Sequence, residues 1–475
     1  MVPLTSTPSW RRKRRRAALL VFCASTIVYC LSPNVTNFDS FLAYPTAVSI
    51  VHHGDLDLDE YTAADVTEHY GNIALDGHRY DRYPWVVSLV FVPAVVVIDA
   101  AAHVGIGGGA TALITQQRSW LVQLAMAALV TGLAAALVTV LAFDRSRARR
   151  GRRTAVALAV GLVFAFGTSS WSTASRSLWQ HGPSMALLAG ALLVADRALR
   201  RPRPSAFAWL GVLTALAYTV RPTNAVVVAA FGVWCATRGW RRLVWYCCGG
   251  APVALVWLSV NWSSYRMLIP PYFQSSRLGV DGTFTEALLA NLFSPSRGLF
   301  VFAPVALFAV AGVVVAIRER RFDSLLAVAV AVFVGYLLVV SAGREAWWAG
   351  DSIGPRFLCD TLPMLALLAV PAVDRLLTPR RARTWSRSLA TAAALAAVVW
   401  SVLVNGGAAV MRATSCWNVQ PASISADPER VWSVRRPQVV EGYVELVEDG
   451  PAAALTGTCT GSTATTATST MTSEG

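Results

Sequence analysis

The sequence predicts an all-α protein that crosses a membrane many times, with about eleven transmembrane helices (ten to thirteen) and a large first loop on the far side. Hydrophobic residues make up 55% of the 475 residues and charged residues only 14%, whereas about a quarter of a soluble protein is charged. The arginines are gathered in short clusters between apolar segments, as the positive-inside rule predicts for cytoplasmic loops. This pattern accounts for the net charge of +14, so no nucleic-acid partner is expected.

The chain begins with a basic segment, residues 1–16, that ends in RRKRRR and is followed at once by the apolar run 17–31. This arrangement resembles a signal peptide, but no clear small-x-small cleavage site precedes Pro33. We therefore expect a retained first helix whose N-terminus lies in the cytoplasm.

Apolar segments then alternate with two kinds of connection, one rich in arginine and one rich in Trp, Ser, Gly and Pro. The predicted spanning helices, which form a transmembrane domain over residues 17–405, are 17–31, 119–143, 154–170, 183–195, 206–220, 223–237, 243–262, 299–317, 323–341, 357–376 and 387–405. The arginine-rich connections, all predicted to be cytoplasmic, are 144–153, 196–203, 238–242, 318–321 and 380–387. An odd number of crossings places the tail outside.

One further apolar segment, residues 83–102, is long enough to span. A crossing here would carry every later arginine cluster to the outer face, against the orientation bias. We therefore predict a re-entrant or juxtamembrane helix within a first outer loop of residues 31–118. Pro84, Pro93 and Asp99 fit an interrupted element at the interface.

The tail, residues 406–475, is predicted to be extracytoplasmic and disordered at its low-complexity end. A small folded element is expected from Cys416 to Val447. Cys416 and Cys459 would both face an oxidising compartment, where a disulfide is possible. The cysteines show no CxxC and no Cys/His metal spacing, so no zinc site is expected.

With this topology, five polar clusters converge on the outer face: 37–40, 167–183, 221–224, 261–298 and 341–360. Charges near membrane depth are costly unless they are paired or hydrated, and outer arginines run against the orientation bias. Lys13 is the only lysine, so an anion site must use arginine, histidine or backbone N–H groups. Guanidinium groups match phosphate oxygens bidentately, which makes a phosphate or pyrophosphate the expected partner.

Several segments in these clusters resemble the GT-C class of membrane glycosyltransferases, which take sugar from polyprenyl-phosphate donors. The resemblance covers roughly residues 15–405. It is carried by Asp39 in the large first outer loop and by RYPWVVSLVFVP, LFSPSRGLFVFAP and WWAGDSIGPRFLCDTLP, at 82–93, 292–304 and 347–363. The last two are similar to segments of bacterial members related to protein O-mannosyltransferases and aminoarabinose transferases.

The resemblance implies a role for three residues. Asp39 becomes the candidate catalytic base, and Arg297 and Arg356 become candidate contacts to the lipid phosphate. The family often shows two acids in the first loop, whereas Asp39 has no acidic neighbour before Asp55. The identity of the base therefore stays open, and Asp39 could instead cap the helix that follows it.

Four further residues of the outer clusters are candidate contacts to phosphate or sugar: Arg221, Arg176, His181 and Trp348. Each also has a structural interpretation. A lone interfacial histidine is often structural, Arg221 precedes a proline between two helices, and Trp348 could either stack on a sugar or anchor the protein at the membrane interface.

No cofactor is expected, with one alternative. Asp55, Asp57 and Asp59 alternate with leucines and could bind a divalent cation, although a solvated face predicts the same pattern.

The predicted function is a polyprenyl-phosphate-dependent glycosyltransferase, inverting and specific for a hexose or pentose, that modifies a cell-envelope acceptor on the outer face. The acceptor could be a glycan, a lipid or a protein. A carboxylate would take the proton of its hydroxyl, while arginines stabilise the leaving phosphate. The alternative is a transporter or flippase of a polyprenyl-linked or glycolipid substrate, but a transporter should carry ionisable residues near the membrane midplane. The composition favours a bacterial plasma membrane.

Overall fold

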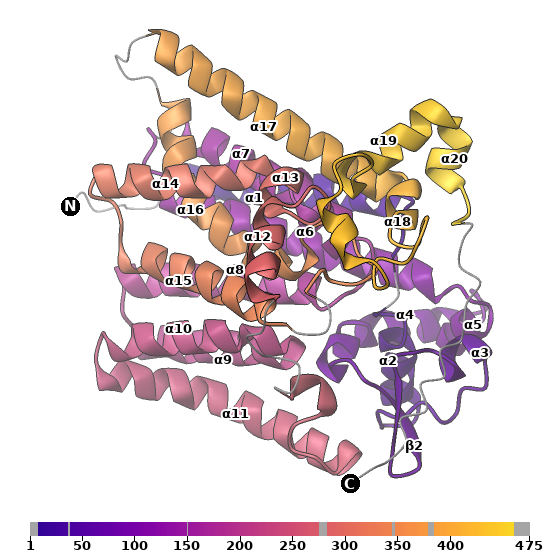
Figure 1. Ribbon diagram of the computed structural model, residues 1–475. Helices are drawn as coiled ribbons and strands as arrows, with labels where there is room; N and C mark the ends of the chain where they lie inside the picture. Colours follow the sequence, from indigo (N-terminus) through magenta and orange to yellow (C-terminus); the bar gives the residue numbers. More distant parts are fainter. Residues whose placement is uncertain are drawn as a thin grey trace.

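The computed structural model describes residues 8–36, 39–149, 151–274, 283–343, 347–378 and 384–459. Within these ranges the protein is helical apart from one two-stranded sheet. Helices lie side by side along one direction, with the first-loop region and the tail at the right of Figure 1. The helices that correspond to the predicted spans are α1 (Pro8–Leu31), α6 (Ser119–Arg145), α7 (Arg153–Phe166), α8 (His181–Arg200), α9 (Pro204–Val220), α10 (Ala225–Ala236), α11 (Trp240–Tyr265), α14 (Leu307–Arg318), α15 (Ser324–Ser341), α16 (Leu362–Leu377) and α17 (Thr384–Val410).

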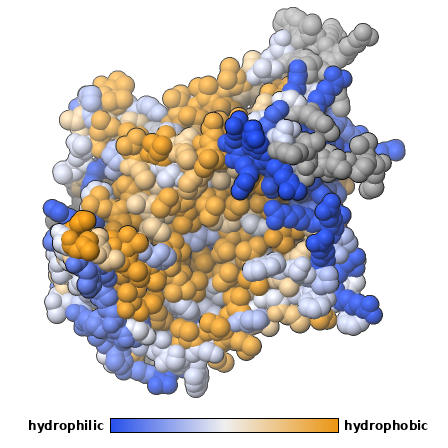
Figure 2. Space-filling model, turned by 180° about the vertical axis from the view of Figure 1, so that it is seen from behind, coloured by the Kyte–Doolittle hydropathy of each residue, from blue (hydrophilic) through white to orange (hydrophobic). Residues whose placement is uncertain are grey.

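In the described part of the chain, six helices are long and apolar enough, by length and composition, to cross a membrane. They belong to α6, α8, α11, α15, α16 with the turn before it, and α17. Seen from behind, the protein shows a broad hydrophobic surface (Figure 2). Exposed apolar side chains on the helices include Leu129, Leu133, Trp209, Leu255, Val256, Val310 and Leu403. A bilayer removes such side chains from water, so the chain is a multi-pass membrane protein, and the number of crossings stays a prediction.

Small residues let the helix backbones approach closely. A Cβ atom on Gly211 of α9 would lie 1.9 Å from the carbonyl oxygen of Tyr246 on α11, and one on Gly249 of α11 would lie 1.9 Å from that of Ala208. Only glycine fits at these two positions. Close backbone contact supplies the van der Waals packing that must join helices where lipid removes the hydrophobic driving force.

Ion pairs gather the arginine-rich helix ends on one side of the bundle. Arg14 of α1 pairs with Asp144 of α6 at 2.9 Å, and Arg145 pairs with Asp196 of α8 at 3.2 Å and with Asp323, the residue before α15, at 2.7 Å. The helices therefore alternate in direction, and three of the predicted cytoplasmic connections share one face. Their orientation relative to the cell stays a prediction.

The first loop forms a compact helical region on the opposite side. Its elements are α2 (Ala43–His52), α3 (Ala64–Thr67), β1 (Asn72–Leu75), β2 (His78–Asp81), η1 (Trp85–Val90), α4 (Val92–His103) and α5 (Gly109–Thr115). The strands pair antiparallel around Asp76 and Gly77, both with positive φ, as a two-residue hairpin turn requires. The predicted interrupted segment 83–102 is η1 followed by α4, and it packs on α2 through Phe91 and Tyr44. Its depth in a bilayer stays a prediction.

Short elements complete the outer side. They are η2 (Ser170–Ala174), η3 (Pro222–Asn224), η4 (Pro271–Phe273), α12 (Phe284–Phe293), α13 (Leu299–Phe302), η6 (Pro304–Ala306), η7 (Arg356–Thr361), α18 (Ala413–Cys416), η8 (Pro428–Trp432), α19 (Gln438–Glu448) and α20 (Gly450–Thr456). The predicted disulfide between Cys416 and Cys459 is present. The low-complexity ending of the tail, and the parts of the polar clusters at 275–282 and 344–346, lie outside the described residues.

Candidate functional site

Asp39 lies between α1 and α2 and accepts three hydrogen bonds. Its Oδ1 accepts from the hydroxyls of Tyr70 and Tyr83, at 2.5 and 2.9 Å, and its Oδ2 accepts from Arg356 at 2.8 Å. Asp39 does not cap α2, because the residue before that helix is Leu42, with no side-chain cap. The carboxylate is therefore held by three distant parts of the chain rather than by its own helix.

The surroundings of Asp39 favour its ionised form. Burial alone would raise the pKa of this carboxyl, but the Arg356 guanidinium and the two tyrosine hydroxyls outweigh burial, and the pKa lies below its ordinary value. Donors that bond to the charged form act in this direction. A quarter of the Asp39 side chain, 25%, remains exposed, so Asp39 is a carboxylate at neutral pH with part of its surface open to a cavity.

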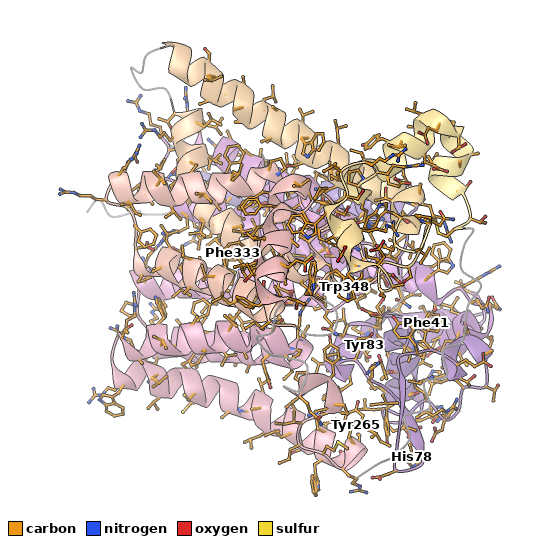
Figure 3. All side chains as sticks on the ribbon, viewed as in Figure 1. Phe41, His78, Tyr83, Tyr265, Phe333 and Trp348 are labelled. Carbon is orange, nitrogen blue, oxygen red and sulfur yellow. A yellow bond between two sulfur atoms is a disulfide. The ribbon has the colours of Figure 1, made fainter. Side chains whose placement is uncertain are left out.

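Asp39 opens onto a narrow cavity of about 40 Å³. Residues from the first loop, the start of α8, the α9–α10 turn and η7 form its walls: Asp39, Ser40, Ala43, Asp81, Tyr83, Pro84, Val87, Leu178, Trp179, Gln180, His181, Arg221, Tyr272, Arg356 and Phe357. A single water needs roughly 10–15 Å³ of such space, so the cavity holds a few water molecules, and a sugar phosphate fits only if the walls part. In Figure 3, Tyr83 lies between the first-loop helices and the helical bundle.

Arg356 is fixed between Asp39 and an aromatic ring. Its guanidinium carbon lies 4.4 Å from the centre of the Trp179 ring, and Trp179 is itself held by a 2.6 Å bond from its indole N–H to the Thr36 carbonyl. The Nε atom of Arg356 is buried and has no hydrogen-bond partner in the described chain. Arg356 therefore lines the cavity and carries one buried donor that no described residue satisfies.

A second arginine reaches the cavity from the break between α9 and α10. The proline after Arg221 ends α9 and leaves Arg221 extended. Its NH1 lies 2.9 Å from Oδ2 of Asp360, and His181 Nδ1 lies 3.0 Å from the same oxygen. Arg221 NH1 also contacts both ring nitrogens of His181, and it lies nearer to Nδ1 than to Nε2. Asp360 therefore holds both residues against the cavity.

Asp81, at the end of β2, supplies a second acid. Its Oδ1 accepts from the backbone N–H of Tyr83 at 2.9 Å. Burial, together with the negative charge of Asp39, raises the pKa of Asp81 to about 8. Two carboxyl groups in one cavity thus differ in protonation at neutral pH, because their environments push their pKa values apart. The hairpin of the first loop thus brings a second acidic side chain to the cavity of Asp39.

Three of the predicted contacts lie outside this cavity. Arg297 is buried and donates to the carbonyls of Trp348, Gly350 and Ser296, at 2.7, 3.2 and 3.0 Å, and to the side chains of Asn418, at 2.7 Å, and Gln438. Its guanidinium is saturated by protein acceptors. Arg297 therefore ties the segments 294–298 and 347–351 to the tail, and its position does not support the predicted phosphate contact.

The other two are Arg176 and Trp348. Arg176 is buried and donates to the carbonyls of Tyr29, Ser32 and Trp171, at 2.7, 2.7 and 3.0 Å, so it anchors the end of α1. Trp348 packs edge-on against Trp347, at 5.8 Å between ring centres. Neither side chain lines the cavity, and the substrate contacts predicted for them are not supported by their positions.

The acidic run of the first loop also lies apart from the cavity. Leu56 and Leu58 are buried, Asp59 is exposed, and Asp55 and Asp57 are half-buried. Groups of Asp57, Asp59 and His78 come within 4.8 Å of one another, and His78 already pairs with Asp59 at 2.7 Å. Figure 3 shows His78 at the tip of the hairpin, away from Tyr83. Both interpretations of these aspartates, a solvated face and a cation site, stay untested.

The sequence analysis missed Tyr83, Asp81 and Tyr272, which line the cavity, and Tyr70, which donates a hydrogen bond to Asp39. Tyr83 stands inside a segment singled out for its family resemblance, and Asp81 follows the buried Tyr80 directly. Two neighbouring strand residues that are both buried break the usual alternation, which marks the hairpin end as packed on both faces.

No family model and no curated protein matches this sequence. Among solved structures, the chain is similar to the archaeal oligosaccharyltransferase AglB from Archaeoglobus fulgidus, in complex with an inhibitory peptide and a dolichol-phosphate. The two share 11% sequence identity at a TM-score of 0.44, over 89% of this chain and 60% of that chain. This chain thus spans less than two thirds of the length of that protein, and a similarity at this level does not establish a shared family.

Proposed function

We propose that this protein is a membrane glycosyltransferase that moves a sugar from a polyprenyl-phosphate donor to a hydroxyl acceptor on the outer face. One observation carries the proposal: an ionised carboxylate, Asp39, shares a cavity with two arginines, Arg356 and Arg221, at the end of an apolar bundle. The carboxylate suits a proton acceptor, and the arginines suit an anionic leaving group.

The proposed reaction is a single displacement. The acceptor oxygen attacks the anomeric carbon and passes its proton to Asp39, while the bond from that carbon to the phosphate oxygen breaks. The phosphate leaves with the bonding electrons, and Arg356 and Arg221 stabilise the charge that develops on it. Attack opposite the leaving group inverts the anomeric centre.

The ion pair between Arg356 and Asp39 gives the donor a role in activating the base. A phosphate near Arg356 competes with Asp39 for its N–H groups, because both are anions that match the guanidinium fork. Transfer of Arg356 to the phosphate would free Oδ2 of Asp39 to receive the acceptor proton. It would also widen a cavity that is too narrow for a sugar while the ion pair is closed.

The remaining walls suit a sugar ring. Tyr83, Tyr272 and Trp179 present aromatic faces or edges to the cavity, and aromatic rings pack well on the apolar faces of sugars. We propose that these side chains position the donor sugar, while Asp360 and His181 hold Arg221 in place.

The test is sugar transfer by purified protein in liposomes that contain radiolabelled polyprenyl-phosphate sugars and membrane acceptors. Asp39→Asn should lower the transfer rate at least 100-fold, since general-base catalysis contributes about 10²- to 10⁴-fold, while donor binding is retained. The matched control is Asp76→Asn, which removes the same charge at the exposed hairpin turn and should leave transfer unchanged.

The other outcomes discriminate between the hypotheses. Transfer that survives in Asp39→Asn would keep the enzyme but reject Asp39 as its base. Movement of donor across the bilayer without any transfer would replace the enzyme with a transporter or flippase.

A further inference from the structure

A second charged cavity lies on the opposite side of the bundle, where the arginine-rich helix ends meet. It measures about 240 Å³, and we call it the arginine cavity. Its walls come from the ends of α6, α8 and α16, the start of α7 and the α14–α15 connection: Asp144, Arg145, Ser146, Arg147, Arg153, Arg200, Arg321, Leu326, Leu367, Val370, Pro371 and Asp374. Since a water occupies about 30 Å³, the space accommodates a group much larger than one water.

The lining carries more cations than anions, five arginines against two aspartates. Some of these charges are balanced within the protein. Arg145 pairs with Asp196 and Asp323, and Arg200 pairs with Asp196 at 2.7 Å. These pairs hold α6, α8 and α15 together and leave little donor capacity.

Arg321 and Arg147 keep donor capacity. Arg321 pairs with Glu319 at 2.9 Å and with Asp374 at 3.3 Å, yet its Nε is buried with no hydrogen-bond partner in the described chain, and only 10% of its side chain is exposed. Arg147 contributes its backbone N–H to Asp374 at 2.8 Å. Its exposed guanidinium has no ion-pair partner among the described residues.

Asp374 does not cancel this excess of positive charge. Its carboxylate already accepts from Ser146 Oγ at 2.6 Å, from the Arg147 backbone and from Arg321. A buried donor without a partner is costly, and a cavity beside it with a net positive lining is suited to an anion. Guanidinium forks match the oxygens of a phosphate, and basic pockets between helices on the cytoplasmic side of membrane proteins bind anionic lipid head groups.

We propose that the arginine cavity binds a phosphate group that approaches from the side predicted to be cytoplasmic, held chiefly by Arg147 and Arg321. This group is carried either by an anionic phospholipid or by a soluble phosphate. The site is separate from the cavity of Asp39, which lies at the other end of the helices, and it does not depend on the sugar-transfer function.

Two measurements on the purified full-length protein test the proposal. The first is thermal unfolding of delipidated protein in detergent, titrated with inorganic phosphate against chloride at equal ionic strength. The second is native mass spectrometry of protein from nanodiscs that contain phosphatidylglycerol and phosphatidylcholine. The variant Arg147→Gln/Arg321→Gln should bind at least tenfold more weakly than the wild type.

The matched control is Arg318→Gln. It removes an exposed arginine from the same side, near Arg321 but outside the cavity lining, and should bind as the wild type does. Arg147→Gln alone, at an exposed side chain without an ion pair, keeps the test valid if the double variant fails to fold, and it too should weaken binding.

The two measurements separate the possible ligands. Stabilisation by inorganic phosphate identifies a soluble phosphate as a sufficient ligand. Selective retention of phosphatidylglycerol without that stabilisation identifies a lipid head group. Absence of both, or equal binding by Arg147→Gln and Arg318→Gln, overturns the proposal.

Discussion

Replacement of Arg356 by glutamine separates the two roles proposed for this arginine. In the transition state Arg356 would stabilise the leaving phosphate, and loss of one such donor typically costs about 3–4 kcal/mol. In the free enzyme Arg356 pairs with Asp39 at 2.8 Å, and the two side chains are 12% and 25% exposed. A partly exposed pair of this kind contributes about 1–2 kcal/mol, which the wild type gives up when the phosphate takes Arg356. The net loss is therefore about 2 kcal/mol, or roughly 30-fold in kcat/KM for the donor.

The assay is the liposome transfer reaction, with kcat/KM for the donor measured across pH. A base must be ionised to act, so the acid limb of the profile follows the pKa of Asp39. Because the Arg356 guanidinium helps to hold that pKa below its ordinary value, the limb should move to higher pH in Arg356→Gln. Arg356→Lys restores the charge but not the fork, so it should return the limb toward its original position and recover only part of kcat/KM.

The control is Arg412→Gln, which removes an exposed arginine from the stretch between α17 and α18. It should leave both the rate and the pH profile unchanged. The reasoning is refuted if Arg356→Gln keeps the wild-type kcat/KM, or if its rate falls while the acid limb stays in place, because Arg356 would then not be coupled to the base.

Three further predictions concern the surroundings of the site. The pKa of Asp81 is raised to about 8, so above that pH a second negative charge appears in the cavity, donor binding should weaken, and KM for the donor should rise. Asp81→Asn should abolish this rise in KM. A rise that persists in the variant would reject Asp81 as its source. Arg297→Leu removes the donor of three buried backbone carbonyls and one of the donors of Asn418 and Gln438. The protein should therefore lose about 3 kcal/mol or more of stability, seen as a lower Tm, while the pH dependence of sugar transfer by the surviving protein stays unchanged. A selective loss of donor affinity would instead place Arg297 on the substrate. Cys459→Ser removes the disulfide to Cys416 and should lower the free energy of unfolding by about 2–4 kcal/mol. The thermal assay should show a lower Tm, with no change in KM for the donor. An unaltered Tm would contradict a structural disulfide.

The broad architecture could be predicted from the sequence because its cause is local. Apolar runs separated by arginine clusters define helices and their alternation, and every predicted span from 17–31 to 387–405 has a helix in the structure. The sequence also indicated that a disulfide between Cys416 and Cys459 is possible, because both cysteines fall in the predicted extracytoplasmic tail. The number of helices that cross the bilayer could not be determined in the same way, because the average hydropathy of a segment does not decide whether it spans.

Only part of the candidate site could be predicted from the sequence. Asp39 and Arg356 were selected through the resemblance to membrane glycosyltransferases, and Arg221 and His181 because charged or polar residues at the ends of apolar helices are rare and costly. The same reasoning selects Arg176, but the tertiary structure places Arg176 outside the cavity, at the end of α1.

What distinguishes these arginines is the set of acceptors that the fold brings to each one. Arg176 and Arg297 are surrounded by backbone carbonyls from segments far away in the chain, which saturate their donors. Arg356 instead faces a cavity with a buried Nε unbonded in the described structure. Asp81 joins Asp39 by the same route, through a hairpin that folds back across the first loop. Composition and order along the chain determine which residues are candidates, whereas only long-range packing decides which of them keep their hydrogen-bonding capacity for a substrate.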